Sequence, residues 1–190
     1  MKIIGGKFKG RKLFSPTDKN LRPTSEKTRE AIFNILTHSI RHFSFEGAKV
    51  IDLFCGTGAL GLEALSRGAV HIIFMDTSQG ALNLTVKNAK TIGELTNTTI
   101  VKSDARCRFP MSLVENCDCD LAFLDAPYNR GLSLPALVRL KESRWLKSKS
   151  IVIAEIAKRE NFKVLKNFKL IDSRDYGSTS ILILEYELND

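Results

Sequence analysis

One short segment has the composition of a site that binds and activates a planar amine. It runs from Asp125 through Ala126 and Pro127 to Tyr128, directly after the apolar run 121–124. The lone pair of such an amine is delocalised into its ring. Two acceptors aimed at its hydrogens, the Asp125 carboxylate and the Ala126 carbonyl, would localise the pair toward an incoming methyl group. Pro127 restricts the turn, and Tyr128 can stack on the ring. Asp-x-Pro is also a common structural turn, so the neighbouring motifs decide between the two interpretations.

A glycine-rich segment lies upstream, after a predicted strand that contains Asp52 and Phe54. Residues 56–61 fit the pattern G-x-G-x-x-G, which alone is weak evidence for a bound nucleotide. Gly56 and Gly58 allow a tight turn and a close ligand, whichever ligand it is. Asp52 discriminates, because a carboxylate at the strand end would repel a diphosphate and attract a cation. S-adenosylmethionine carries a sulfonium and an ammonium group but no phosphate, so the loop favours this cofactor over a dinucleotide.

Two further acids follow predicted strands, and each has two interpretations. Asp76 can bind ribose hydroxyls, or it can cap the helix that follows. Asp104 can accept a hydrogen bond from an adenine amino group, or it can belong to a turn.

These residues depend on an alternation of strands and helices, which apolar runs and helical spacing indicate. The predicted helices are 24–41, 59–67 and 79–92, and the predicted strands are 49–54, 70–75, 98–102, 121–124, 150–155, 168–174 and 178–186. In the third helix, the residues expected to face inward are Ala81, Leu82, Val86 and Ala89. The last two strands predict a hairpin. The expected fold is one Rossmann-like α/β domain over residues 1–190, with a mostly parallel seven-stranded sheet and an antiparallel C-terminal edge.

The net charge of +8 is unevenly distributed. Residues 1–47 hold ten Lys/Arg and four Asp/Glu, a balance of +6, whereas residues 48–190 hold nineteen and seventeen, a balance of +2. A basic N-terminal arm and helix (1–47) on a near-neutral core (48–190) is typical of a surface that docks a polyanion such as RNA, although a solvated face is the alternative. The side chains expected to contact phosphates are Lys7, Lys9, Arg11, Lys12, Arg22 and Arg29. Phe8 and Phe14 can stack on bases or anchor the arm in the core.

Composition argues against several other classes of protein. Cys55, Cys107, Cys117 and Cys119 lack the paired spacing of a zinc site, so we expect reduced thiols and no metal. No window approaches the ~18 consecutive apolar residues of a membrane span, and the first residues do not resemble a secretory signal. We therefore expect a cytoplasmic protein without membrane contact, and a monomer.

The chain resembles the RsmD family of bacterial 16S ribosomal RNA guanine-N2-methyltransferases, which are class I S-adenosylmethionine enzymes. The matching segments are 3–6, 10–13, 22–24, 29–30, 33–34, 52–54 with 58–67, 125–128, 130–132 and 176–177. The resemblance implies that Asp52, Gly56 and Gly58 hold the cofactor and that Asp104 contacts its adenine. It also implies that Asp125 and Tyr128 bind the guanine amino group, and it adds Arg130 to the residues expected to contact RNA. The implied fold is the Rossmann-like class I methyltransferase fold, and the implied partner is 16S rRNA or the small ribosomal subunit.

The chain departs from the family's pattern at two positions. Ala126 replaces the first of two prolines, and Phe74 stands where the family tends to have a Glu that grips the ribose. Four alternatives stay open: a DNA adenine-N6 methyltransferase, a protein glutamine methyltransferase, a dinucleotide oxidoreductase, and a non-catalytic RNA-binding assembly factor. Asp125 and the N-terminal arm argue against the first two, and Asp52 argues against the third.

Overall fold

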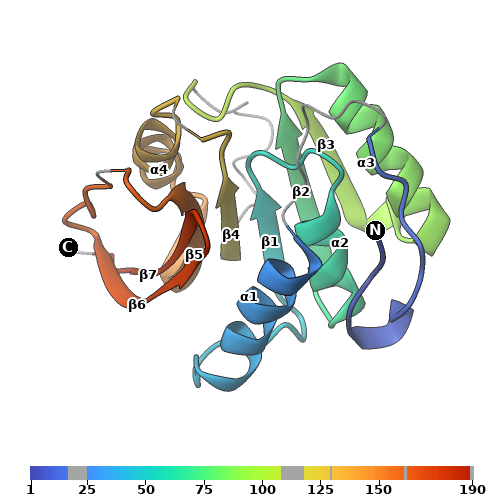
Figure 1. The fold of residues 1–190 in the computed structure, drawn as a ribbon, viewed down its shortest axis with the longest axis horizontal. Helices are drawn as coiled ribbons and strands as arrows, with labels where there is room; N and C mark the ends of the chain where they lie inside the picture. The colour runs from blue at the N-terminus through green and yellow to red at the C-terminus, as the bar shows by residue number, and fades with distance from the viewer. Residues whose placement is uncertain (17–24, 108–117, 129, 161, 189–190) are drawn as a thin grey trace.

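Seven strands form one sheet, and its order explains where a ligand would bind. The computed structural model describes residues 1–16, 25–107, 118–128, 130–160 and 162–188. The strands are β1 (Lys49–Asp52), β2 (His71–Asp76), β3 (Thr98–Lys102), β4 (Cys119–Asp125), β5 (Leu146–Ala157), β6 (Phe168–Tyr176) and β7 (Thr179–Tyr186). They lie in the order β3-β2-β1-β4-β5-β7-β6 (Figure 1). The strands from β3 to β5 are parallel, and β7 is antiparallel to both β5 and β6. The predicted fold class, including the C-terminal hairpin, is confirmed.

Helices cover both faces of this sheet. They are α1 (Glu26–His38), α2 (Ala59–Ser66), α3 (Gln79–Ile92) and α4 (Ser133–Glu142), with short 3-10 turns at Gly6–Phe8 and Leu95–Asn97. One buried cluster joins α1, α2 and α3 to Val50, Ile72 and Phe123, and the other joins α4 to Ile51, Ile73 and Ala122. Adjacent residues of a strand point to opposite faces, so the two clusters are the two sides of the sheet. Because both faces of the sheet are buried, its strands consist mostly of apolar residues.

Local sequence patterns predicted the ends of most helices and strands to within a few residues. Ser25 caps α1, because its hydroxyl accepts a hydrogen bond from the Thr28 N–H at 3.0 Å. The α3 and β3 boundaries match the predictions, whereas α1 ends at His38, earlier than expected, and β5 begins earlier than expected. The patterns did not predict α4. The N-terminal arm is a hairpin-like turn with an antiparallel bridge between Lys2 and Lys12.

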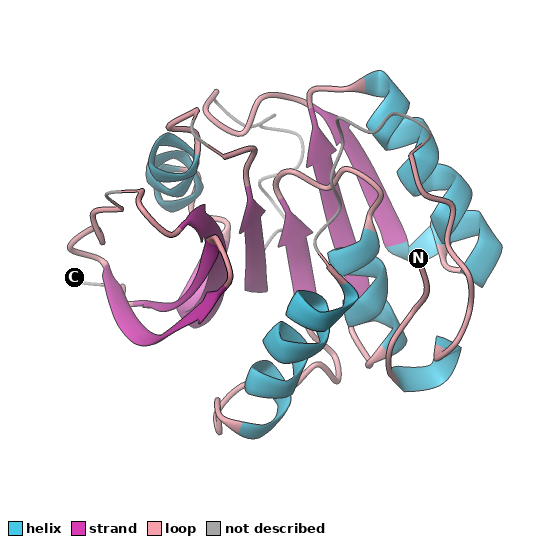
Figure 2. Cartoon of the chain, in the orientation of Figure 1, coloured by secondary structure: helices cyan, strands magenta, loops and turns pink. Residues whose placement is uncertain are grey.

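The direction in which the strand order runs reverses between β1 and β4. From β1 the sheet continues to β2 and β3 in one direction, and from β4 to β5 in the other. The arrowheads of β1, β2 and β4 point to the same edge, from which the loops leave (Figure 2). In open α/β sheets, ligands bind outside the carboxyl ends of the strands at this reversal. The glycine loop follows β1 and the Asp125 segment follows β4, so both motifs lie at this reversal.

Candidate active site at the carboxyl edge of the sheet

Asp52 ends β1 and lies beneath the glycine loop rather than in solvent. Its side chain is 1% exposed, and one carboxylate oxygen accepts a hydrogen bond from the Gly61 N–H at 3.4 Å. The other oxygen has no hydrogen-bond partner among the described residues. Burial raises the pKa of Asp52 to about 7, and the nearby Asp76 adds to this rise. The chain therefore holds a buried carboxyl group whose charge is only partly compensated.

Three side chains form hydrogen bonds with the backbone of the glycine loop. The Gly56 N–H donates to the Asp76 carboxylate at 3.0 Å, and the Thr85 hydroxyl donates to the Gly56 carbonyl at 3.0 Å. The Asn88 amide donates to the Thr57 carbonyl at 2.9 Å. Gly58, the N-cap of α2, has a φ of +76°, and a Cβ there would lie 2.8 Å from the Thr85 methyl carbon. The loop is therefore preorganised by its contacts with β2 and α3.

Thr85 and Asn88 were not among the site residues that the sequence predicted. Both are fully buried on α3, whereas Val86, which we expected to face inward, is only half-buried. The available signal was the pair of polar residues spaced three apart on the same side as Leu82 and Ala89. Buried polar groups need partners, and the loop carbonyls are those partners.

The remaining predicted cofactor residues lie at or just after the carboxyl ends of β1, β2 and β3. Asp76 accepts from Gly56 with one oxygen and from the Ser78 N–H at 2.8 Å with the other, while Ser78 caps α3. The capping role considered for Asp76 therefore belongs to Ser78. Phe54 is partly buried against the cluster that contains α4. Asp104 pairs with the Arg106 guanidinium at 2.5 Å, which holds the pKa of Asp104 below its ordinary value.

Phe74 has a structural role at the position where the family tends to have a ribose-binding Glu. It is 0% exposed, and a Cβ on Gly61 would lie 2.4 Å from its ring. Because Gly61 has no Cβ, α2 can pack closely against the Phe74 ring on β2. Phe74 is therefore part of the helix–sheet contact, and the acid that ends β2 is Asp76.

The segment after β4 places an acid and an aromatic beside the glycine loop. Asp125 is the last residue of β4 and pairs in register with Glu155 of β5. Ala126 is 3% exposed, Pro127 is exposed, and Tyr128 is 39% exposed. The Tyr128 hydroxyl donates to the Glu155 carboxylate and lies 2.9 Å from the Thr179 hydroxyl. Burial, together with the bond to Glu155, raises the pKa of Tyr128, so its phenol stays neutral.

Three of the predicted phosphate contacts on the N-terminal arm, Lys9, Arg11 and Lys12, are exposed. Arg130, beyond the Asp125 segment, is also exposed. Lys7 is half-exposed and forms an ion pair with Glu94 at 2.8 Å. Arg22 lies outside the described residues.

The prediction for Arg29 is wrong. Its side chain is 0% exposed, and its guanidinium donates to the Lys2 carbonyl at 2.5 Å. Burial lowers the pKa of Arg29, and the opposing charge of Glu63 partly compensates. A buried guanidinium cannot reach a phosphate. Arg29 instead anchors the N-terminal arm through the Lys2 carbonyl.

Glu63 and Ser66 of α2, which the sequence did not single out, hold the arm in place. The Glu63 carboxylate accepts from the N–H groups of Ile4 and Gly5 at 2.7 and 2.8 Å. The Ser66 hydroxyl donates to the Gly5 carbonyl at 2.6 Å and accepts from the Phe8 N–H at 3.0 Å. Phe8 packs partly buried against the core, as the anchoring interpretation expects.

Phe14, at the end of the arm, is 44% exposed and does not anchor it through its ring. Asn88 instead fixes the Phe14 backbone, accepting from its N–H at 2.7 Å and donating to its carbonyl at 3.1 Å. The Lys87 ammonium lies 3.5 Å from the centre of the Phe14 ring. Since Asn88 also holds Thr57, a single side chain joins the arm to the glycine loop.

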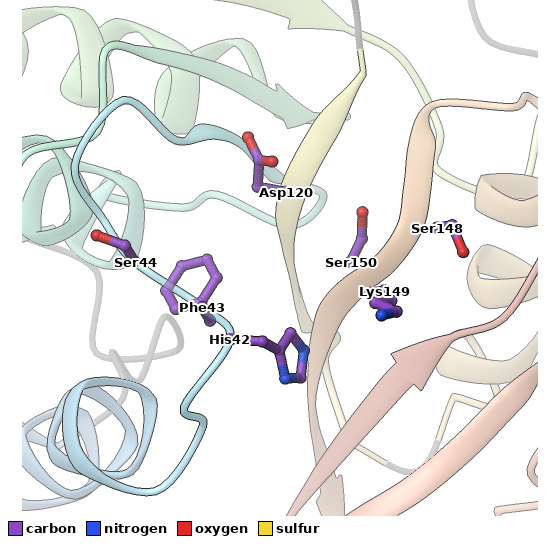
Figure 3. A pocket seen from close by; sticks show the side chains of 7 residues that line it. All are labelled: His42, Phe43, Ser44, Asp120, Ser148, Lys149 and Ser150. Carbon is purple, nitrogen blue, oxygen red and sulfur yellow. The ribbon is translucent and has the colours of Figure 1, made fainter.

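Other features of the described residues do not form a second site. A cavity of about 180 Å³ is lined by His42, Phe43, Ser44, Asp120, Ser148, Lys149 and Ser150 (Figure 3). It lies near the starts of β4 and β5, at the opposite edge of the sheet. The Asp120 carboxylate there already accepts from the Lys49 N–H and from Lys147, both at 2.9 Å. Within the described ranges, no three His, Cys, Asp or Glu side chains gather as they would around a metal ion. No helix in the part of the chain that the structure covers has the length and apolar character needed to cross a membrane.

The sheet order, the glycine loop after β1 and the Asp125 segment after β4 define the class I methyltransferase fold. Comparison with known proteins agrees. Residues 1–185 match the family described as "Conserved hypothetical protein 95", and the chain belongs to this family. The resemblance noted in the sequence is thereby confirmed.

Named relatives cover nearly the whole chain. It is 29% identical to "Putative rRNA methyltransferase YlbH" of Bacillus subtilis, over 96% of this chain and 97% of the relative. It is 34% identical to "Ribosomal RNA small subunit methyltransferase D" of Escherichia coli strain K12, over 82% of this chain and 74% of the relative. Among solved structures, "Putative methyltransferase yhhF from Escherichia coli" is 28% identical, with a TM-score of 0.82 and 98% of each chain covered.

Proposed function

We propose that this chain transfers a methyl group from S-adenosylmethionine to the exocyclic N2 amino group of a guanine in 16S ribosomal RNA. The observation that carries the proposal is the placement of the Asp125–Tyr128 segment next to the glycine loop, at the reversal of the strand order. Membership of a family whose relatives are named as methyltransferases of small-subunit ribosomal RNA supports the same activity. The core (48–190) would catalyse the reaction, and the basic arm and helix (1–47) would dock the RNA.

The glycine loop fits S-adenosylmethionine better than a diphosphate. A diphosphate at a helix N-terminus binds free backbone N–H groups. Here the Gly56 and Gly61 N–H groups donate to the carboxylates of Asp76 and Asp52, and the Gly58 N–H donates to the Cys55 carbonyl at 2.7 Å. The uncompensated oxygen of Asp52 favours a ligand with a positive charge. These contacts disfavour a dinucleotide oxidoreductase.

The residues that would hold the cofactor follow from this arrangement. Gly56 would leave room for it, and Gly58, whose missing Cβ faces Thr85, would shape the loop around it. Asp76 would bind the ribose hydroxyls, and Asp104 would accept from the adenine amino group. The bound cofactor supplies an electrophilic methyl group on a positively charged sulfur. Asp52 would compensate that positive charge from beneath the loop, and Phe54, which is partly buried against the cluster that contains α4, would border the site.

The Asp125 segment would act on the guanine. The Asp125 carboxylate and the Ala126 carbonyl would accept hydrogen bonds from the two amino hydrogens and thereby concentrate the lone pair on the nitrogen. Once the nitrogen carries the methyl group, it would lose one of these protons to the Asp125 carboxylate. Tyr128 stacks on the base and Pro127 restrains the turn between them. Ala126 is buried despite replacing a proline, so packing restrains the segment where the ring is missing. Most of the rate enhancement comes from holding the amine against the methyl group. The base must leave any helix to enter this site.

The RNA would lie along the exposed basic side chains. Lys9, Arg11 and Lys12 on the arm and Arg130 near the Asp125 segment can bind phosphates. Lys7 would first have to leave its ion pair with Glu94, whose side chain is only 10% exposed, so we expect Lys7 to contribute less than Lys9, Arg11 and Lys12. We place the reaction in the cytoplasm, with the enzyme acting as a monomer. Light scattering in solution tests the monomer.

A labelled-methyl transfer assay tests the function. Small ribosomal subunits, naked 16S RNA, duplex DNA and a release factor are each incubated with the purified chain and labelled S-adenosylmethionine. Incorporation into ribosomal RNA, with N2-methylguanine found by mass spectrometry, supports the proposal. Incorporation only into DNA or protein would replace it with one of the other methyltransferase activities. RNA binding without any incorporation would identify an assembly factor.

The variant Asp125→Ala tests the assigned acceptor. It should reduce turnover by about 10²-fold or more, the usual effect of removing a group that stabilises the reacting atoms, and leave cofactor affinity within about twofold. Equal losses in turnover and in cofactor affinity would contradict the role of Asp125.

A further inference from the structure

The aromatic residue of the Asp125 segment is attached to two strands that lie outside that segment. The Tyr128 hydroxyl donates its hydrogen to the Glu155 carboxylate and lies 2.9 Å from the Thr179 hydroxyl, which donates to it. Glu155 lies near the carboxyl end of β5, and Thr179 is the first residue of β7. Both are buried, at 5% and 8% exposure, whereas Tyr128 is 39% exposed. A half-exposed ring is thus held at its buried hydroxyl end.

The same position on β5 also supports the acid of the segment. Asp125 pairs with Glu155 in the parallel β4–β5 register, and β7 continues the sheet beyond β5. Glu155 therefore contacts the aromatic of the segment and is the strand neighbour of its acid. The C-terminal hairpin contributes the second contact through Thr179. Together they fix the ring relative to the two acceptors proposed for the amine.

The geometry points to Glu155 and Thr179 as positioning residues for methyl transfer, which act through the Tyr128 hydroxyl. This inference rests on the proposed function, since it assigns the ring the task of stacking on the base. A carboxylate acceptor suits the task because a hydrogen bond to a charged group is stronger than one between neutral groups. Glu155 does not touch the substrate. Its effect is to keep the ring parallel to a base that enters the site.

A double-mutant cycle on methyl transfer tests the inference. Glu155→Ala should lower kcat/KM for RNA about tenfold, as expected for loss of a hydrogen bond to a charged group, with cofactor affinity unchanged. Tyr128→Phe keeps the ring and removes the hydroxyl, so it should cause a similar loss. In the Tyr128→Phe background, Glu155→Ala should add less than about twofold, because both changes break the same contact. Multiplicative losses in the two backgrounds would overturn the inference.

Conservative variants separate positioning from a general structural role. Glu155→Gln keeps an acceptor for the phenol and should restore most of the activity lost in Glu155→Ala. Thr179→Val preserves the side-chain shape and removes only the hydroxyl, so it serves if Glu155→Ala does not fold. It should reduce kcat/KM by a few-fold and leave the unfolding midpoint nearly unchanged. Full activity in Thr179→Val together with no rescue in Glu155→Gln would reject the inference.

An NMR measurement without substrate separates this inference from the proposed function. With ring-labelled tyrosine, the Tyr128 signals are those absent from a Tyr128→Ala variant. In the wild type they should show a fixed ring, and in Glu155→Ala and Thr179→Val a ring that averages over more conformations. A fixed ring that these variants release, in a protein that methylates no RNA, would refute the proposed function alone. A ring unchanged in both variants, in a protein that methylates 16S RNA, would refute the positioning role alone.

Discussion

The buried carboxyl group of Asp52 should make the stability of the chain depend on pH in an unusual direction. Burial raises the pKa of Asp52 from 3.8 to about 7 in the folded protein. Between these values the folded state keeps a proton that the unfolded state has lost. The contribution of Asp52 is therefore complete below about pH 4, decreases as the pH rises, and is lost above about pH 7.

The size of the effect follows from the linkage relation. One bound proton corresponds to about 1.4 kcal/mol of unfolding free energy for each pH unit, so about 2–3 kcal/mol is lost between about pH 5 and pH 7. Asp52→Asn cannot ionise and should lack this component. Urea unfolding of both proteins at several pH values measures the difference in slope directly.

Asp175→Asn is the matched control for this experiment. Asp175 is exposed, and hydrogen bonds from Ser180 and Lys158 lower its pKa. Asp175 is ionised in the folded and unfolded states between about pH 5 and pH 7, so its removal should not change the slope of the unfolding free energy against pH. Parallel stability curves for the wild type and Asp52→Asn would refute the argument that Asp52 is a buried carboxyl group whose charge is only partly compensated. The positive charge of S-adenosylmethionine favours the ionised form of Asp52, so cofactor binding near pH 6.5 should release a proton from Asp52. Calorimetry in two buffers should detect this release in the wild type and not in Asp52→Asn.

Three further substitutions test the close contacts and the RNA surface. Gly61→Ala should destabilise the fold by about 1–3 kcal/mol, because the new Cβ would lie 2.4 Å from a buried aromatic ring; thermal unfolding measures this. Asn88→Ala should lower the free energy of unfolding by about 1–3 kcal/mol and weaken S-adenosylmethionine binding, because it leaves the Phe14 and Thr57 backbone groups without their partner. Urea unfolding measures the first effect, and calorimetry measures the second. Changing Arg11 and Lys12 together to Ala should reduce the slope of log affinity against log salt by about 1.4 for single-stranded RNA, as filter binding at several salt concentrations would measure.

The glycine substitution and the double basic substitution each have a control of the same chemical type. Gly80→Ala adds a methyl group on the exposed first turn of α3, where it would lie 3.7 Å from the Ser78 hydroxyl oxygen, and should not destabilise the fold. Lys147 and Lys149, changed together to Ala, remove the same charge near the start of β5 and should leave the salt slope unchanged. Equal effects in variant and control would contradict the respective argument. An Asn88→Ala protein with wild-type stability and affinity would show that the arm and the loop are not joined through this side chain.

The sequence alone determined the elements that carry the proposed chemistry. Apolar runs that end in Asp52, Asp76 and Asp125 define strands by local composition, and parallel connections bring their carboxyl ends to one edge. Gly56 and Gly58 mark the loop because few other residues adopt its backbone conformation. These signals are short-range, so they can be found without knowing which strands are neighbours.

Only the tertiary structure decided which polar side chains hold these motifs in place. The contacts of Asn88 with Phe14 and of Glu155 with Tyr128 span many residues of sequence and depend on strand order and register. Burial also changed the role of Arg29, since a charge pattern does not show on which side of a helix the core lies. A residue type limits the bonds a side chain can make, but the fold brings the partner within reach and removes the competing water.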